Sequence, residues 1–454
     1  MHFHSFARGI DVGAHCYLLE LGTSRILLDA GTHPKRVGVD TLPDIHDLPI
    51  DSADAILLSH AHLDHFGALP VLCRQFPSAP VFATEETFAV GEALLHNSVN
   101  VMTSQRRELE IGAYPLYTHR EIDHIVPSWM PRRFGQRFEV GDGVSATFLP
   151  AGHVLGAAGI VLRDAGRTIF YTGDVHFEDQ SLCQAADFSE IEGEKIDTMI
   201  IETTRGESDR RADYTRESEI DHLIEAIRET LARGGSVMLP VFAFGKTQEL
   251  LMMLYEAIED GRLPQVPVHI GGLSTKITAL FDRLSSTSRR FHQGFQILDD
   301  FPRLVRPARK EPEPPYGPGR IYAISSGMMS ENTVSNRFAH HFLPNPDNAI
   351  LFVGYADPET PAGRILSAEP GDILSMNDRG TGRRMPLKCR IEKFDFSGHA
   401  PRDQLLDYII RINPKHAVLV HGDEPARRWF ADQLRQRCPH MRVTIPDPGT
   451  PLNL

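Results

Sequence analysis

The sequence predicts an α/β protein of two domains, and three observations support this class. The chain has 454 residues, which exceeds the roughly 250–300 at which a single hydrophobic core stops growing. With 41% hydrophobic and 24% charged residues, it has the composition of a globular protein rather than a disordered or collagen-like one. Strand-like runs also alternate with amphipathic helical patterns, which predicts parallel strands connected by helices.

The first 200 residues contain short strand-like runs, several of which end on polar residues. One helical stretch is predicted over 63–76. Apolar patterns predict strands over 16–21, 24–29, 53–59, 80–83, 145–149, 168–172 and 198–202. Because the ends of neighbouring strands meet at one edge of a sheet, the polar residues that follow them are candidates for a shared site.

The middle of the chain alternates helices and strands more regularly. Apolar residues at helical spacing predict a helix over 214–233, which Gly234-Gly235 ends. The Pro-rich segment 302–319 is predicted to be a loop or linker. Further strands are predicted over 236–242, 266–270, 321–325, 349–353, 389–394 and 417–420, and further helices over 245–260, 401–412 and 425–437.

Composition narrows the environment in which the protein works. No run of about 18 apolar residues is present, so no membrane span is expected, and the N-terminus lacks the features of a signal peptide. Five scattered cysteines without a C-x-x-C pair predict reduced thiols in a cytoplasmic protein. The formal net charge of −13 argues against coating nucleic acid through bulk charge.

The strongest chemical signal is S-H-A-H-L-D-H at 59–65, directly after an apolar strand. His60 and His62 are two residues apart, so in an extended segment they point to the same side. Asp64 and His65 follow where the chain turns toward a helix, so they can reach a second point nearby. Imidazole and carboxylate groups suit zinc and similar ions. A histidine-rich surface loop is the alternative, but such a loop needs no buried strand before it.

Three later residues sit at the ends of other predicted strands. His153 lies in P-A-G-H, Asp174 in Y-T-G-D and His421 in V-L-V-H-G-D. Taken singly, each is more often a turn aspartate or a core histidine. Taken together at one sheet edge, they favour a metal site.

These motifs resemble the β-CASP branch of the metallo-β-lactamase superfamily. The resemblance extends to D-V-G-A-H-C-Y-L-L at 11–19, I-L-L-D-A-G at 26–31, F-A-F-G-K-T-Q-E-L at 242–250, S-S-G-M-M at 325–329, F-V-G-Y at 352–355 and F-S-G-H-A at 396–400. It implies an αββα metallo-β-lactamase sandwich formed by residues 1–203 and 388–454. An α/β β-CASP domain, residues 204–387, would be inserted into it.

The resemblance also implies a role for each residue of the site. Two Zn²⁺ ions are expected, with Mn²⁺ or another divalent ion as the alternative. Asp174 would bridge them, and Asp29 would orient ligands. Glu202 and His399 would form a catalytic dyad, Asp64 would also be catalytic, and the turn Ser325-Ser326-Gly327 is a candidate phosphate contact. The first ion would be held by His60, His62 and His153, and the second by Asp64, His65 and His421.

The implied activity is zinc-dependent hydrolysis of single-stranded RNA, endonucleolytic, 5′-to-3′ exonucleolytic or both. A histidine at the last motif, here His421, is typical of the RNA-cleaving members. His399 in its protonated form would donate to the leaving 3′-oxygen after water attacks phosphorus. The alternatives are a single-stranded DNA nuclease, a small-molecule metallo-hydrolase and a non-catalytic scaffold. No membrane partner is expected, and the oligomeric state is left open.

Overall fold

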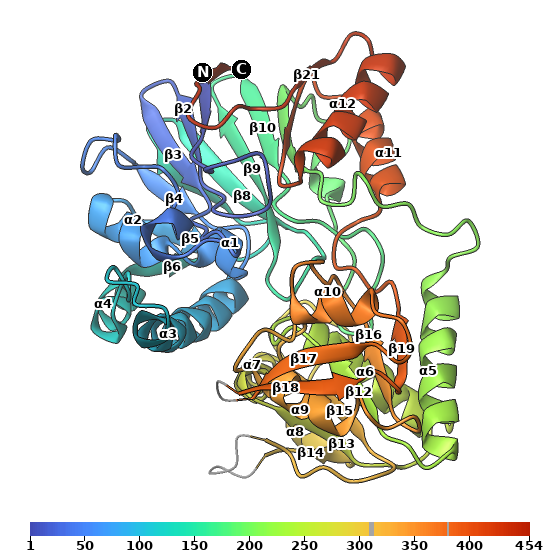
Figure 1. The fold of residues 1–454 in the computed structure, drawn as a ribbon. Coiled ribbons are helices and arrows are strands. Elements are labelled where there is room, and N and C mark those ends of the chain that lie inside the picture. The colour runs from blue at the N-terminus through green and yellow to red at the C-terminus, as the bar shows by residue number, and fades with distance from the viewer. Residues whose placement is uncertain (308–312, 379–380) are drawn as a thin grey trace. The chain divides into compact units, whose positions relative to one another are not determined.

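The computed structural model describes residues 1–307, 313–378 and 381–454 (Figure 1). The described chain forms two compact units. Unit 1 comprises residues 1–179, 184–210 and 399–454, and unit 2 comprises residues 180–183 and 211–398. The domain limits at 203/204 and 387/388 stay predictions.

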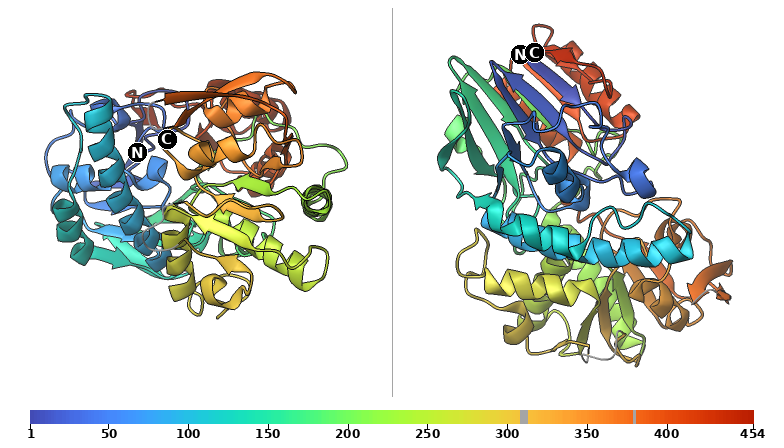
Figure 2. Two further views of the ribbon diagram at one scale, coloured as in Figure 1. Left: turned by 60° about the horizontal axis from the view of Figure 1, so that its bottom comes forward. Right: turned by 90° about the vertical axis from the view of Figure 1, so that its left-hand side faces the viewer.

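Unit 1 contains two seven-stranded sheets that pack face to face (Figures 1 and 2). The first has the order β22-β1-β2-β3-β4-β5-β6 and is built from β1 (His2–Ser5), β2 (Tyr17–Leu21), β3 (Ser24–Leu28), β4 (Ala55–Leu57), β5 (Val81–Ala83), β6 (Trp129–Pro131) and β22 (Leu452–Asn453). The second has the order β21-β20-β11-β10-β9-β8-β7 and is built from β7 (Arg137–Gly141), β8 (Val144–Pro150), β9 (Ala158–Asp164), β10 (Arg167–Tyr171), β11 (Thr198–Glu202), β20 (His416–Val420) and β21 (Arg442–Thr444).

Alternate residues of the first sheet face two different cores. Ile26 and Leu28 pack with the second sheet, whereas Leu27 and Ile56 pack with Phe66 and the other helical residues of the opposite face. This is the period of two expected for a strand buried on both sides. The helices on that face are α1 (Leu63–Phe66), α2 (Leu69–Gln75), α3 (Glu85–Glu108) and α4 (His119–Ile125).

Helices α11 (Arg402–Ile412) and α12 (Glu424–Arg437) lie against each other, and α12 contacts β20 and β21 of the second sheet (Figure 1). Unit 1 therefore has four layers in the order helices, sheet, sheet, helices.

Unit 2 is built around a six-stranded parallel sheet in the order β14-β13-β15-β12-β16-β19. Its strands are β12 (Val237–Pro240), β13 (Val268–Gly271), β14 (Leu304–Val305), β15 (Ile321–Ile324), β16 (Ala349–Phe352) and β19 (Arg390–Lys393). The strands β17 (Ile373–Asp378) and β18 (Thr381–Pro386) form a separate antiparallel pair. The helices are α5 (Arg216–Ala232), α6 (Lys246–Glu259), α7 (Leu273–Arg283), α8 (Ile297–Asp300), α9 (Val334–Phe338) and α10 (Pro361–Leu366).

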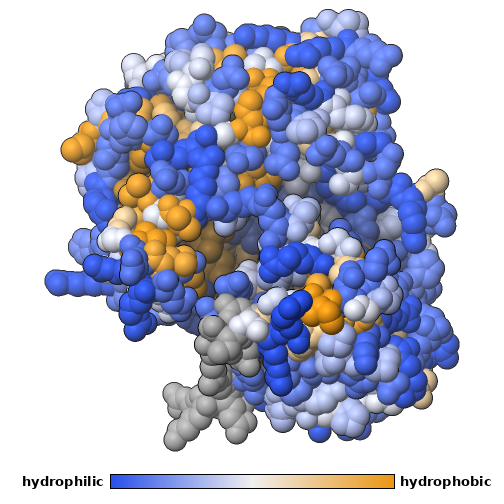
Figure 3. Space-filling view, viewed as in Figure 1, coloured by the Kyte–Doolittle hydropathy of each residue, from blue (hydrophilic) through white to orange (hydrophobic). Residues whose placement is uncertain are grey.

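Four short 3₁₀ turns complete the described elements, at Gly38–Thr41, Val126–Ser128, Ser189–Ile191 and Ala339–His341. Among the described residues, no helix combines the length and apolar character that crossing a membrane requires. The face of the molecule seen in Figure 3 is largely hydrophilic.

The structure differs from the sequence prediction at several places, and elements such as α4, α9, α10, β7 and β9 were not predicted. The helix predicted over 63–76 is broken into α1 and α2, and the loop predicted over 302–319 contains the short strand β14, with 308–312 outside the described residues. The 24-residue helix α3 was not predicted at all. Its first three turns are buried on several sides, at positions such as Phe88, Val90 and Leu95, so no single apolar stripe marks it in the sequence.

Candidate metal centre

The histidine-rich loop at 59–65 is held against β3 by backbone hydrogen bonds. Ala30 N–H, just after β3, donates to His65 O at 2.7 Å, and Thr32 N–H donates to Leu63 O at 2.7 Å. Gly31 permits this approach, because a Cβ at that position would lie 1.6 Å from the Asp64 carbonyl oxygen. The loop is therefore fixed by the sheet rather than free on the surface.

The first cluster of ligand-type atoms consists of His60, His62, His153 and Asp174. His62 Nδ1 lies 3.0 Å from His60 Nε2 and 3.1 Å from His153 Nε2. Asp174 Oδ2 lies 3.5 Å from His60 Nε2 and 3.7 Å from His153 Nε2. Ligands about 2.05 Å from one ion at tetrahedral angles would be roughly 3.3 Å apart, so these spacings match those around a small divalent ion.

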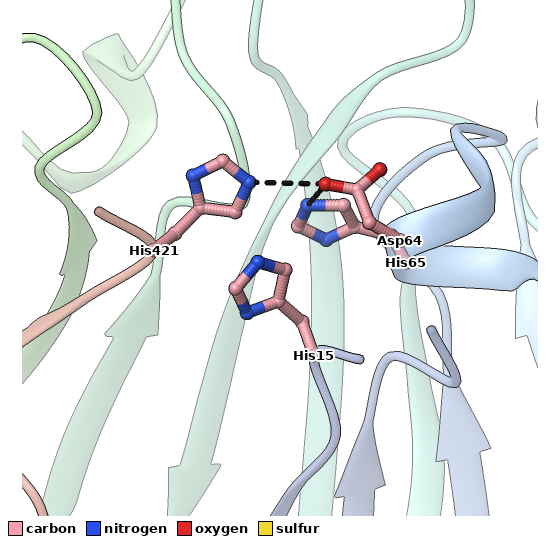
Figure 4. Close-up of side chains that lie close together, drawn as sticks. All are labelled: His15, Asp64, His65 and His421. Carbon is pink, nitrogen blue, oxygen red and sulfur yellow. Dashed lines mark hydrogen bonds and ion pairs between the residues drawn. The ribbon is translucent and has the colours of Figure 1, made fainter. Parts of the chain in front are cut away.

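The second cluster includes Asp64, His65 and His421 (Figure 4). His421 Nε2 lies 3.4 Å from Asp64 Oδ2, and His65 Nε2 lies 3.7 Å from the same oxygen. Asp174 Oδ1 lies 3.4 Å from both His65 Nε2 and His421 Nε2. The two oxygens of Asp174 therefore face different clusters, which is the arrangement of a bridging carboxylate.

The charge states of these residues favour cation binding. Burial would raise the pKa of Asp174, but the imidazoles of His421 and His65 outweigh it and hold the pKa well below its usual value. Burial lowers the pKa of His62 to about 4. Burial would lower the pKa of His65, but the carboxylates of Asp174 and Asp29 outweigh it and raise the pKa well above its usual value. A divalent ion binding there would take the place of the proton on the imidazole.

Buried polar atoms without hydrogen bonds provide a separate test of this fit. Within the described structure, His65 Nε2 and Asp174 Oδ1 are buried and make no hydrogen bond. Such atoms are costly to bury unless something satisfies them. Both atoms belong to the second cluster, so a bound cation would satisfy them, and the residues present fit two divalent ions.

Asp29 supports the second cluster from behind. This fully buried carboxylate lies 2.6 Å from His65 Nδ1. It also accepts hydrogen bonds from the Ser59 backbone and hydroxyl at 2.7 and 2.8 Å, and from Tyr171 Oη at 2.5 Å. With Nδ1 donating its proton to Asp29, the lone pair of His65 lies on Nε2, toward the cluster.

Glu202 and His399 form a pair beside Asp174. His399 Nδ1 lies 3.1 and 3.0 Å from the two oxygens of Glu202, and 3.9 Å from Asp174 Oδ2. Val175 N–H donates to Glu202 Oε1 at 2.7 Å. Burial would lower the pKa of His399, but the carboxylates of Glu202 and Asp174 outweigh it and raise the pKa. The pair can therefore present a proton donor at this edge of the clusters.

All ten predicted metal, catalytic and orienting residues lie in unit 1, and the structure brings them together. Ser325, Ser326 and Gly327 lie in unit 2, after β15. In that turn the backbone N–H of Ser330 donates to Ser326 Oγ at 3.2 Å. Gly327 lines a small cavity of about 10 Å³ together with Phe242, Lys246 and Tyr355.

Sequence reasoning missed two residues that shape the centre. Thr204 Oγ1 donates to Glu202 Oε2 at 2.6 Å and lies 2.7 Å from His421 Nδ1, so it links the catalytic pair to the second cluster. His15 is fully buried beside Asp64, His65 and His421. Thr204 could have been suspected from its place two residues after Glu202, and His15 from its place in the 11–19 motif.

Three family models match the chain in order. They are a metallo-β-lactamase superfamily domain over residues 18–204, a Beta-Casp domain over 247–365 and a Zn-dependent metallo-hydrolase RNA specificity domain over 384–446. A crystal structure of a protein of unknown function from Enterococcus faecalis shares the fold, with a TM-score of 0.59 and 15% identity over 100% of both chains.

Curated relatives match nearly the whole chain. Transcription termination factor FttA of Methanothermobacter thermautotrophicus is 30% identical over 98% of this chain and 69% of its own length. Endoribonuclease ysh1 of Schizosaccharomyces pombe is 29% identical over 100% of this chain, which spans only 59% of that relative. The probable RNase MJ4 of Methanocaldococcus jannaschii is 29% identical over 91% of each chain.

Fold and family matches together define the chain as a metallo-hydrolase. Within that class it belongs to the β-CASP family of the metallo-β-lactamase superfamily. The fold class and the family predicted from the sequence are both confirmed.

Proposed function

We propose that the protein is a ribonuclease that hydrolyses phosphodiester bonds of single-stranded RNA with the help of two divalent ions, most simply Zn²⁺. The observation that carries this proposal is the position of the Glu202–His399 pair, which lies beside the carboxylate shared by both metal clusters. The names of the relatives that are called ribonucleases also support it.

His60, His62 and His153 would hold one ion, Asp64, His65 and His421 the other, and Asp174 would bridge them. Two ions in such a site supply an activated water at neutral pH and neutralise charge on the phosphodiester. Asp29 and Thr204 hold the ligand imidazoles of His65 and His421 in the tautomers that leave Nε2 available.

His399 would act as the general acid. Its Nδ1 faces Glu202, so the proton on Nε2 is the one available to the leaving 3′-oxygen of the RNA. Glu202 favours the protonated imidazole and fixes its orientation. The products would carry a 5′-phosphate and a 3′-hydroxyl, because water adds to phosphorus and the 3′-oxygen leaves with the proton.

Residues 204–387 would form the inserted domain, and Ser325, Ser326 and Gly327 with Lys246 are its candidate phosphate contacts. A lysine and a turn with two hydroxyl groups suit an anionic backbone. We place the activity in the cytoplasm, since all five cysteines are free thiols.

Cleavage of short oligonucleotides tests the proposal. RNAs labelled at the 5′ or 3′ end, and carrying a 5′-phosphate, 5′-triphosphate or 5′-hydroxyl, separate exonucleolytic from endonucleolytic attack. Matched DNAs test substrate choice, and a small ester tests for a different hydrolase. Single-stranded RNA should be cleaved fastest. Faster cleavage of DNA, or turnover of the ester without nuclease activity, would refute the proposal.

Two variants test the assigned roles in the same assay. The double variant Asp64→Ala/His65→Ala should lose metal and activity together. His222→Ala, a matched variant at an exposed histidine of α5, should cleave as the unmodified protein does. Normal cleavage by the double variant would contradict the metal assignment.

A further inference from the structure

His15 is a buried histidine that belongs to none of the predicted ligand sets. It follows β1 and precedes β2, and its side chain is fully buried. One ligand-type atom from each of His15, Asp64, His65 and His421 lies within 4.8 Å of the others. Figure 4 shows the His15 ring lying beside these three residues. An additional imidazole at this position calls for a physical role.

The backbone of His15 is tied directly to the ligand loop. His15 N–H donates to the Asp64 carbonyl at 3.0 Å, and Gly31 N–H donates to the His15 carbonyl at 2.8 Å. Any movement of His15 would therefore be transmitted to Asp64. The ring is consequently held at a fixed distance from the second cluster.

Both ring nitrogens of His15 are already engaged. Gly13 N–H donates to Nε2 at 3.0 Å, so Nε2 carries no proton. The proton is then on Nδ1, which lies 2.9 Å from Tyr17 Oη and donates to it. Neither lone pair nor proton is left to point at the cluster, so this geometry is not that of a metal ligand.

The ring of His15 packs against two of the candidate ligand imidazoles at tilted angles. Its centroid lies 4.2 Å from that of His421 and 4.8 Å from that of His65. His421 is held at its Nδ1 edge by Thr204 at 2.7 Å, and its backbone has a φ of 45°, a conformation that needs support from its surroundings. His15 and Thr204 therefore restrain the same imidazole from two directions.

We propose that His15 is a positioning residue that holds His421 and His65 in place for the second divalent ion without binding the ion itself. This proposal rests on the metal centre of the proposed function. Without the ring, only Thr204 would restrain the His421 imidazole beside Asp64 and Asp174, and the ion held there would bind more weakly. The first cluster does not contact His15 in this way, so its affinity should be unchanged.

Metal affinity measured at each position tests the proposal without relying on activity. The purified full chain is stripped with a chelator, and Zn²⁺ binding is measured by competition with a coloured chelator. Bound Co²⁺ reports the geometry through its visible absorption. The variants are His15→Ala, His15→Gln and His15→Phe. His416→Phe provides a matched control at a buried histidine, since His416 begins β20, the strand that His421 follows.

Affinity for the second ion should depend on the ring of His15 more than on its nitrogen atoms. His15→Ala and His15→Gln should weaken the second ion about tenfold or more, as loss of a supporting residue does elsewhere, and leave the first unchanged. His15→Phe should stay within about threefold of the unmodified protein, and His416→Phe should bind both ions normally. If His15→Ala does not fold, as judged by circular dichroism, His15→Gln gives the same comparison.

Two results would overturn the proposal. Unchanged affinity at the second position in both His15→Gln and His15→Ala would mean that the ring positions nothing. An equal loss in His15→Phe and His15→Ala would mean that a ring nitrogen acts directly on the ion. Either result can be distinguished from a failure of the proposed function, because in that case the unmodified chain would bind fewer than two ions.

Discussion

Replacing Asp29 by Asn should weaken the second metal position although Asp29 is not a ligand. The carboxylate accepts four hydrogen bonds, from Ser59 N, Ser59 Oγ, Tyr171 Oη and His65 Nδ1. An amide offers only one acceptor oxygen, so its NH₂ group must face at least one donor. Three donors, including His65 Nδ1, meet Oδ2, and only the Ser59 N–H meets Oδ1, so the amide oxygen should take the place of Oδ2. A neutral amide oxygen would hold the His65 imidazole less strongly than the charged carboxylate does.

The size of this effect follows from the nature of the contact. Mutation of a hydrogen-bonded partner of a metal-binding histidine costs about 10–100-fold in metal affinity, or about 1.4–2.7 kcal/mol. Asp29→Asn should therefore bind the second Zn²⁺ about 10–100-fold more weakly and the first normally. Chelator competition on the stripped protein measures both constants.

Asp282→Asn is the matched control for this experiment. Asp282 is also a buried carboxylate that accepts two backbone N–H groups, from Ile297 at 2.7 Å and Leu298 at 2.9 Å, but it lies in unit 2. It should lose stability without changing either metal constant. If Asp29→Asn binds both ions within about twofold of the unmodified protein, the proposed support of His65 by the Asp29 carboxylate is wrong.

Three further predictions address the catalytic pair, pH and metal removal. His399→Ala should lose RNA cleavage while still binding two ions. An unchanged rate of cleavage in this variant would show that His399 is not the general acid. Burial, and to a smaller extent Arg320, lowers the pKa of His269 to about 4. Below about pH 6.5 the unfolded state therefore binds a proton that the folded state does not, and the free energy of unfolding falls as the pH falls toward 4. At pH 5 this free energy should be lower by about 2 kcal/mol. Denaturant unfolding of His269→Phe should show about that much less acid sensitivity between pH 7 and 5, and an unchanged difference would contradict the shift. Chelation should lower the melting temperature, because ions that bind only the folded state at 100 times their Kd stabilise it by about 2.7 kcal/mol, and Asp64→Ala/His65→Ala should show a much smaller response.

The sequence singled out the candidate ligands better than the residues around them. His60, His62, Asp64 and His65 share one short motif, and Asp174 ends a recognisable strand, so local patterns were enough to single them out. His15 and Thr204 matter through contacts with His421, which is more than 200 residues further along the chain. No local pattern marks such contacts.

In the fold, too, local features were predictable from the sequence and features that depend on distant contacts were not. Strands such as β11 were predicted residue for residue, because Thr198–Glu202 is a short apolar run closed by a charged residue. Helix α3 was missed, since burial on several sides removes its periodicity. Strand β19 was predicted over 389–394, but its pairing with β16 of unit 2 depends on tertiary structure.

The net charge of −13 also has a clearer interpretation. Asp29, Asp64, Asp174 and Glu202 are four of the acids, and they are gathered at one centre, where two divalent ions would offset their charge. The remaining acidic exterior should disfavour bulk coating of nucleic acid.

The most direct test of a two-ion ribonuclease is a titration of the metal-free protein with Zn²⁺, in which bound metal and cleavage of a labelled single-stranded RNA are measured together. Cleavage should be absent without metal and should rise as the second equivalent binds. Cleavage by the metal-free protein, full activity at one equivalent, or two bound ions without any cleavage would contradict the account.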